Sequence, residues 1–127
     1  MKYQLFYQQH MIATIEEDSA DFPAFFGRYR LEPIVDISEL AHLRAYIEFS
    51  VRVDPLRDQE RFDDPAMSEQ EAFTDLIDSP DWSLVETRTR RRIPLLIPMF
   101  CAESGVICRL NTSIKTDETA RGEKKRS

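Results

Sequence analysis

The residue types best suited to chemistry are carboxylates near the N-terminus and arginines later in the chain. Acidic side chains gather in the segment 16–21. Asp18 and Asp21, which lie near Glu16 and Glu17, could hold a cation or act as general acid and base. A calcium loop needs oxygen ligands at defined intervals and usually a turn glycine, which this segment lacks. Dense carboxylates are mostly solvated loop charge, so this pattern alone predicts no catalytic centre.

The arginines at positions 88, 90, 91 and 92 form the densest positive feature of the chain. Alternate residues of an extended strand share a face, so Arg88, Arg90 and Arg92 would present together if this segment is extended. That face could bind an anion or an acidic partner, or it could balance the acidic body and protect a sheet edge. We therefore take these three arginines as candidate partner-binding residues.

Motifs for nucleophilic or metal chemistry are missing from the sequence. The three glycines are scattered, and neither a phosphate-binding loop nor a G-x-S-x-G, H-E-x-x-H or C-x-x-C motif is present. Cys101 and Cys108 flank a turn and could be cross-strand neighbours, but with only two distant histidines they lack zinc spacing. We predict two reduced, buried thiols, no metal and no cofactor.

The charge balance restricts the class of partner. The net charge is −6, and residues 1–110 carry twelve Lys and Arg against twenty Asp and Glu, or −8. An acidic body argues against general nucleic-acid affinity and favours a basic partner. No apolar run approaches the ~20 residues that span a membrane, and the N-terminus lacks a signal-peptide pattern. We expect a cytoplasmic protein with neither nucleic acid nor membrane as partner.

A helix that is apolar on two faces is the most informative predicted element. Asp36 to Glu39 reads as a capping box, which predicts a helix from Asp36 to about Val51. Leu40, Leu43 and Ile47 would line one face, and a sheet can cover that face. The residues of the second face need a second helix or a second molecule, either a partner protein or another copy of the chain: Tyr46, Phe49 and Val53.

A second, shorter helix is available to cover that face. Another capping box, Ser68 to Glu71, precedes apolar Phe73 and Leu76, and Asp78-Ser79-Pro80 would end the helix. A charged loop with prolines, residues 54–67, which could contain a helical turn, joins the two predicted helices.

Six strands are expected around these helices. The N-terminal half supplies a hairpin and a third strand in which Gly27 marks a bulge or the close approach of another group. The C-terminal half supplies a meander whose middle strand contains Pro94 and Pro98, so the pattern leaves open whether that strand is central or at an edge. The predicted strands are Tyr3 to Gln8, Met11 to Glu17, Phe25 to Leu31, Trp82 to Glu86, Ile93 to Phe100 and Val106 to Leu110.

The resulting order, β-β-β-α-α-β-β-β, predicts an α+β fold: a mostly antiparallel sheet of five to six strands packed on two helices. Residues 1–110 would form one domain, and 111–127 a disordered polar tail. We expect one shared core made by Trp82, Leu84, Leu95, Ile97 and Ile107 together with Leu40, Leu43 and Ile47.

The N-terminal third resembles a group of small uncharacterised bacterial proteins. The resemblance rests on Ile12-Ala13-Thr14-Ile15, the acidic segment, and Asp21-Phe22-Pro23-Ala24-Phe25-Phe26-Gly27-Arg28-Tyr29. It covers about the first 35 residues and implies a bacterial origin and a small α+β domain. The group has no established activity, so the resemblance transfers no catalytic residues.

Two functions remain open from the sequence. The first is a small protein–protein binding module, an adaptor or a neutralising partner, supported by the acidic body and the spare apolar helix face. The alternative is a small hydrolase or transferase in which carboxylates of the acidic segment work with the arginine cluster as an anion clamp.

Overall fold

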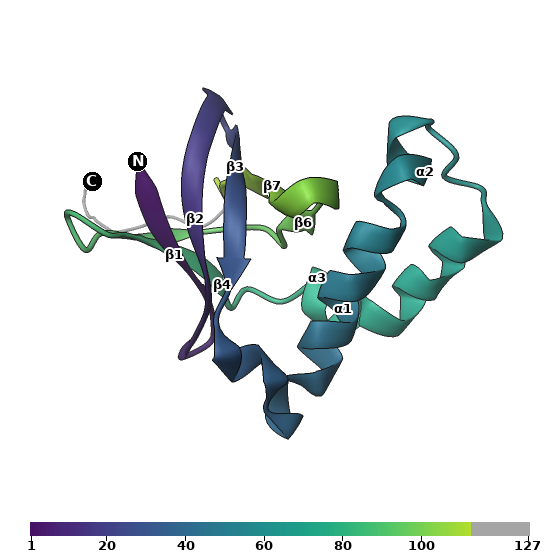
Figure 1. Cartoon of the computed structure of the whole chain (residues 1–127), viewed down its shortest axis with the longest axis horizontal. Helices are drawn as coiled ribbons and strands as arrows, with labels where there is room; N and C mark the ends of the chain where they lie inside the picture. The colour runs from purple at the N-terminus through teal and green to yellow at the C-terminus, as the bar shows by residue number, and fades with distance from the viewer. Residues whose placement is uncertain (113–127) are drawn as a thin grey trace.

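A curved antiparallel sheet forms one side of the molecule and a layer of helices forms the other (Figure 1). The computed structural model describes residues 1–112; most of the predicted polar tail, 113–127, lies outside the described residues. The strands are β1 (Lys2–Tyr7), β2 (His10–Asp21), β3 (Ala24–Leu31), β4 (Trp82–Glu86), β5 (Arg92–Pro94), β6 (Met99–Phe100) and β7 (Gly105–Arg109).

Helical segments occupy the middle of the chain, between β3 and β4. Two 3-10 turns, η1 and η2, lead into the main helix α1, and a longer 3-10 helix, η3, leads into α3. The bounds are η1 (Pro33–Asp36), η2 (Ser38–Leu40), α1 (Ala41–Arg52), α2 (Asp54–Asp58), η3 (Pro65–Phe73) and α3 (Thr74–Ile77), with a last turn, η4 (Ala102–Ser104), before β7.

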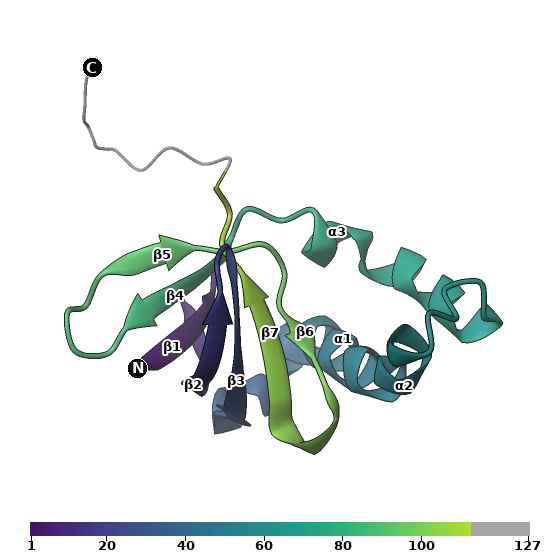
Figure 2. The ribbon, with the colours of Figure 1, turned by 90° about the horizontal axis from the view of Figure 1, so that it is seen from above.

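The sheet curls until its two edges meet at one end. Its strand order is β5-β4-β1-β2-β3-β7-β6, with every pair antiparallel. Leu95 bridges to Leu110, the Leu96 N–H donates to the Arg109 carbonyl at 3.0 Å, and the Asn111 N–H donates to the Pro94 carbonyl at 3.0 Å. The segment from β5 to β6 therefore joins both edges, and Figure 2 shows the strands converging there.

The predicted middle strand of the meander is divided in two. Arg92–Pro94 pairs with β4, whereas Met99–Phe100 pairs with β7. Proline cannot donate to a ladder, so Pro94 and Pro98 restrict how far either pairing extends. The segment lies between β4 and β7 but uses a different half with each, which gives seven strands rather than the expected five to six.

Strand β2 is longer than predicted and takes in the acidic segment. The predicted strand ended at Glu17, but residues 19–21 also pair with β3, beyond a register shift between Glu17 and Ser19. Gly27 lies opposite this irregularity, and a Cβ there would stand 2.5 Å from the Glu16 carbonyl oxygen. The close approach predicted from Gly27 is confirmed.

The core fills the concave side of the sheet and the space beneath α1. Trp82, Leu84 and Leu95 are fully buried, and the Trp82 indole N–H donates to the Leu76 carbonyl at 2.9 Å, which fastens β4 to α3. Six of the eight predicted core residues are at most 5% exposed, while Ile97 and Ile107 are only half-buried. The α+β class and the antiparallel sheet are confirmed.

Both helix starts differ from the predicted capping boxes. Asp36 ends the turn η1 and pairs with Arg44 instead of capping, because Ile37 is extended (ψ 152°) and α1 begins only at Ala41. The second helical segment begins at Pro65, where the Asp64 side chain accepts from the Ala66 N–H at 3.0 Å. Ser68 instead donates to the Pro65 carbonyl.

Candidate functional site

The two layers carry opposite charge. The helical middle of the chain, residues 32–81, holds fourteen carboxylates against four arginines, a net charge of −10. The sheet-forming segments, 1–31 and 82–112, hold eight Lys and Arg against six carboxylates, or +2. The arginine-rich turn between β4 and β5 and the helix α2 lie at opposite ends of the molecule (Figures 1 and 2), so charge is separated along its long axis.

An acidic recess lies at the far end of the helical layer. Its volume is about 530 Å³, and it is formed where the chain leaves α2 and enters η3. Phe62, 61% exposed, supplies an aromatic wall. The other lining residues are Asp63, Asp64, Pro65, Met67, Ser68, Gln70, Glu71 and Thr74.

The carboxylates of this recess differ in how far they are already used. Asp64 receives the Arg61 guanidinium at 2.6 Å and caps η3, so its oxygens are committed. Within residues 1–112, Asp63 and Glu71 form no ion pair, and both are exposed. The recess therefore presents two unpaired carboxylates beside an exposed aromatic ring, an arrangement suited to a cation with an apolar stem.

The predicted second face of α1 is covered within the chain. Tyr46, Phe49 and Val53 are 5%, 3% and 0% exposed. Phe73 of η3 packs on Tyr46 and Phe49 with ring centroids 5.7 and 5.4 Å away, so these residues form the internal seam with the second helical segment. A partner could reach them only if η3 moved away.

The arginine turn is tight rather than extended. The Arg90 N–H donates to the Glu86 carbonyl at 2.8 Å, and Arg90 has φ 64°, so Arg88 and Arg90 do not follow strand alternation with Arg92. Arg92 lies in β5, donates to the Ser83 hydroxyl at 2.6 Å and covers the Phe6 ring at 4.8 Å. The segment is not extended, so the condition under which the three arginines would share a face is not met.

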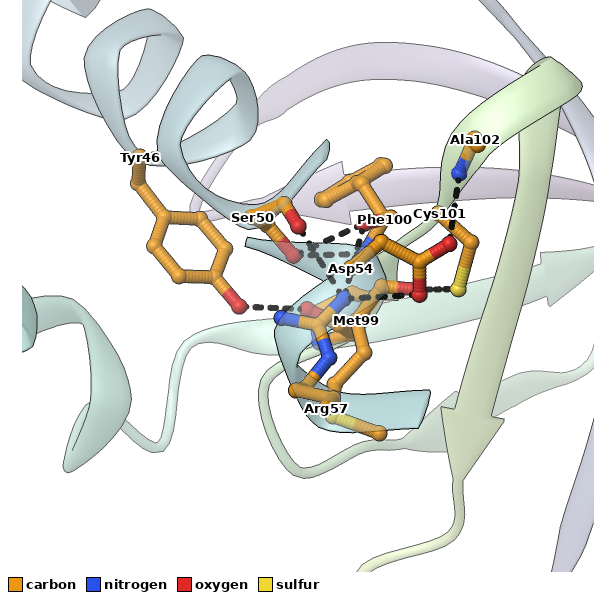
Figure 3. A network of polar contacts seen from close by, with 9 residues as sticks. Tyr46, Ser50, Asp54, Arg57, Met99, Phe100, Cys101 and Ala102 are labelled. Atoms are coloured by element: carbon orange, nitrogen blue, oxygen red, sulfur yellow. Dashed lines mark hydrogen bonds and ion pairs between the residues drawn. The ribbon is translucent and has the colours of Figure 1, made fainter. Parts of the chain in front are cut away.

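A buried polar network joins α1 and α2 to β6 (Figure 3). The Ser50 hydroxyl donates to the Phe100 carbonyl and accepts from the Phe100 N–H, each at 2.9 Å. Arg57 donates to the carbonyls of Ser50 and Phe100 and pairs with Asp54 at 3.4 Å. Asp54 also accepts from the Ala102 N–H. Sequence reasoning missed this network, because nothing in the residue types shows which carbonyls face the helix.

The thiol beside this network is poorly suited to nucleophilic chemistry. Burial, followed by the nearby Asp54 carboxylate, raises the pKa of Cys101. Burial also raises the pKa of Cys108 to about 12. Thiolate is the reactive form, so neither group is activated at neutral pH. Both cysteines are free, as predicted, although Cys101 is only half-buried.

His42 pairs with one carboxylate at the surface. Its Nε2 lies 3.0 Å from Asp75, its ring packs on Phe73, and its hydrogen bond lowers the pKa of Asp75.

In the described chain the only ion pair made by the acidic segment joins Asp18 to Arg28. Within residues 1–112, no three His, Cys, Asp or Glu side chains converge to hold a metal ion.

Comparison with known proteins gives no family for this chain. Among residues 1–112, none of the helices combines the length and apolar character required to cross a bilayer. The likeness to the bacterial group stays a prediction. No family model matches the sequence, and neither a curated protein nor a solved structure matches it.

Proposed function

We propose that this protein is a protein–protein binding module that holds a positively charged segment of its partner in the acidic recess between Phe62 and Thr74. The observation that carries the proposal is the recess itself: two unpaired carboxylates and an exposed aromatic ring at the end of a helical layer with net charge −10. This surface replaces the second face of α1 as the candidate contact.

The recess favours a lysine or arginine side chain of the partner over a small cation. The aliphatic stem would lie against Phe62 and Met67, and the charged end would face Asp63 and Glu71. A guanidinium gains further from the ring face, by about 0.5–1 kcal/mol at an exposed site. Exposed charges are screened beyond about 10 Å at 0.1 M salt, so binding should weaken as salt rises.

The surrounding charge favours the same kind of partner. Asp58 is the last residue of α2, Glu60 follows it just before the recess, and both are exposed. A field of one sign over such a surface speeds the encounter with an oppositely charged chain. The protein would therefore act by occupying a basic surface, as an adaptor or a neutralising partner does.

The test is a titration of the full chain with a short peptide of alternating alanine and arginine, in which binding is monitored by the NMR shifts of the backbone amides. Saturable shifts should centre on residues 62–74. The double variant Asp63→Asn/Glu71→Gln should lose this binding, and Phe62→Ala should weaken it. Affinity capture from cell extract with wild-type and double-variant baits would then identify a natural partner.

The matched control removes the same two charges elsewhere. Asp21→Asn/Glu103→Gln neutralises two exposed carboxylates of the sheet segments and should bind the peptide as the wild type does. Equal weakening by both double variants would mean that only net charge matters, which would overturn the recess as the site. Failure of the wild type to bind the peptide at low salt would overturn the proposal as a whole.

A further inference from the structure

We propose that the outward face of β1, β2 and β3 binds a phosphorylated small molecule with at least two anionic groups. This site lies on the sheet, not on the acidic helical layer, and it is independent of the function proposed above. The observation that carries it is a hollow in which cations and neutral donors gather with little to neutralise them.

The hollow has a volume of about 480 Å³. The strand register places its side chains in two rows on one face of the sheet: Lys2, Glu16 and Arg28 in one row, and Gln4, Thr14 and Arg30 in the next. Thr87 closes the end nearest the β4–β5 turn, where its N–H donates to the Lys2 carbonyl at 3.0 Å. Leu5, Ala13 and Ile15 alternate with these residues along the strands and are buried. The face that carries the two rows therefore points away from the core.

The local charge contrasts with that of the whole chain. Three cations and one carboxylate line the hollow, a net +2 in a protein whose net charge is −6. Arg28 meets Asp18 at 3.6 Å, with both side chains more than half exposed. Within the described chain, the side chains of Lys2, Gln4, Thr14 and Arg30 form no hydrogen bond or ion pair with protein. Their donors are therefore available to a ligand.

Phosphate is the anion that this donor set fits. Guanidinium groups bind phosphate oxygens through two parallel hydrogen bonds, the ammonium supplies a point charge, and hydroxyl and amide groups donate further bonds. Strands lie about 4.8 Å apart, so the backbone positions of Lys2 and Arg28 are about 10 Å apart across β2, and those of Arg28 and Arg30 about 7 Å apart along β3. A diphosphate or triphosphate can offer each of these spread cations a separate anionic oxygen, which favours it over a single phosphate.

The shape favours a small molecule over a nucleic acid strand. The volume falls within the range of about 300–1,000 Å³ usual for ligand pockets. Single-stranded nucleic acid needs exposed aromatic rings on which bases stack. The two tyrosines here turn toward the core: Tyr3 stacks on buried Phe25 at 5.2 Å, and Tyr29 meets buried Phe100 edge-on at 5.0 Å.

Replacing Glu16 tests the site through an expected gain in affinity. Its carboxylate stands between Lys2 and Arg28 in the register, where it opposes an anion. One phosphate would therefore lie over Gln4, Thr14 and Arg30, away from Glu16, and the other would be bound by Lys2 and Arg28. Replacing Glu16 by glutamine should raise affinity several-fold, whereas Glu48→Gln, the same change on the exposed side of α1, should leave it unchanged.

The experiment is calorimetric titration of the full chain with sodium pyrophosphate and, separately, adenosine triphosphate at low salt. Both should bind saturably. Arg30→Gln should weaken binding about tenfold, as expected for the loss of roughly 1.4 kcal/mol. Arg52→Gln, an equal charge change at an exposed arginine of α1, should have no effect. Circular dichroism confirms that each variant is folded.

Three results would overturn the site. They are absence of saturable binding by either phosphate compound, equal weakening by Arg30→Gln and Arg52→Gln, and unchanged or lower affinity in Glu16→Gln. Tighter binding of a single-stranded oligonucleotide than of the triphosphate, with a steep salt dependence, would instead identify a nucleic-acid surface and refute the small-molecule assignment.

Discussion

Replacing Ser50 by alanine tests whether the network between α1 and β6 stabilises the fold. Ser50 is fully buried, and its hydroxyl both donates to and accepts from the backbone of Phe100 at 2.9 Å. The Cys101 N–H bonds to the Gly105 carbonyl at 2.8 Å, so the N–H of the preceding residue, Phe100, points away from β7 and toward the helix. Ser50 is therefore the partner that satisfies this N–H.

The magnitude follows from which group is left without a partner. In Ser50→Ala the Phe100 carbonyl keeps the Arg57 guanidinium at 3.2 Å, but the Phe100 N–H loses its acceptor in a buried site. An orphaned buried donor costs about 1–3 kcal/mol. We expect a loss of about 2 kcal/mol in the free energy of unfolding, which lowers Tm by roughly 8 °C for a domain of this size.

Ser83→Ala is the matched control for this change. Ser83 is 8% exposed, and its hydroxyl accepts from the Arg92 guanidinium at 2.6 Å. Water can replace that acceptor because Arg92 is exposed, so we expect a loss below about 1 kcal/mol. Urea unfolding of both variants, followed by circular dichroism, measures the difference. The reasoning fails if Ser50→Ala costs no more than Ser83→Ala.

Three further changes test the core, a buried phenol and a close backbone contact. Leu43→Ala should cost about 2–5 kcal/mol in urea unfolding, because Leu43 is 2% exposed; a loss typical of surface sites would contradict this packing. Tyr46→Phe should cost about 1 kcal/mol at pH 8 by losing the hydrogen bond to the Pro98 carbonyl. Burial raises the pKa of Tyr46 from 10.0 to about 12, so the native state keeps a proton that the unfolded chain loses, and the wild type's advantage over Tyr46→Phe should shrink between pH 10 and 12. Gly27→Ala should cost about 1–3 kcal/mol in thermal unfolding, because the new Cβ would stand 2.5 Å from the Glu16 carbonyl; an unchanged Tm would show that β2 gives way freely.

Local patterns were sufficient for most of the strands and for the body of α1. Alternation and turn residues located the hairpin, the third strand and the first and last strands of the meander, because strand periodicity depends on neighbouring residues. The middle strand, predicted as one element, is divided into β5 and β6. The closure of the sheet was not predictable, since it depends on contacts between Leu95 and Leu110, far from any turn. Pro94 and Pro98 left open whether this strand is central or at an edge, and in the structure each neighbour pairs with a different part of it.

The helix starts show where one local signal overrides another. The capping box at Ser68 competes with Asp64-Pro65, in which aspartate caps and proline takes the first helical position, and the earlier signal prevails. Asp54 and Pro55 are the first two residues of α2, a short helix inside the segment predicted as a loop that could contain a helical turn, although Asp54 does not cap it. An Asp-Pro pair before a polar stretch was the available indication in both cases.

The candidate surfaces were predictable only in part. The acidic character of the chain was evident, but its concentration in residues 32–81 acquires meaning once those residues form a separate layer. Tyr46 and Phe49 were correctly identified as needing cover, and Phe73 supplies it. The recess beside Phe62 could not be inferred, because a charged loop gives no periodicity from which its shape follows.

The separation of charge between the layers affects the stability of the helical layer and leaves charged groups on both surfaces. Excess like charge destabilises a compact layer through self-repulsion, and the helical layer carries −10. The hydrogen bonds of Ser50 and Arg57 with the backbone of Phe100 join this layer to the sheet (Figure 3). The polar groups of this network would otherwise suggest a catalytic site, but they are occupied in holding the two layers together. Asp63 and Glu71 of the recess and Lys2 and Arg30 of the sheet remain outside this network. Within residues 1–112 they form no ion pair, so they are available to a ligand of opposite charge.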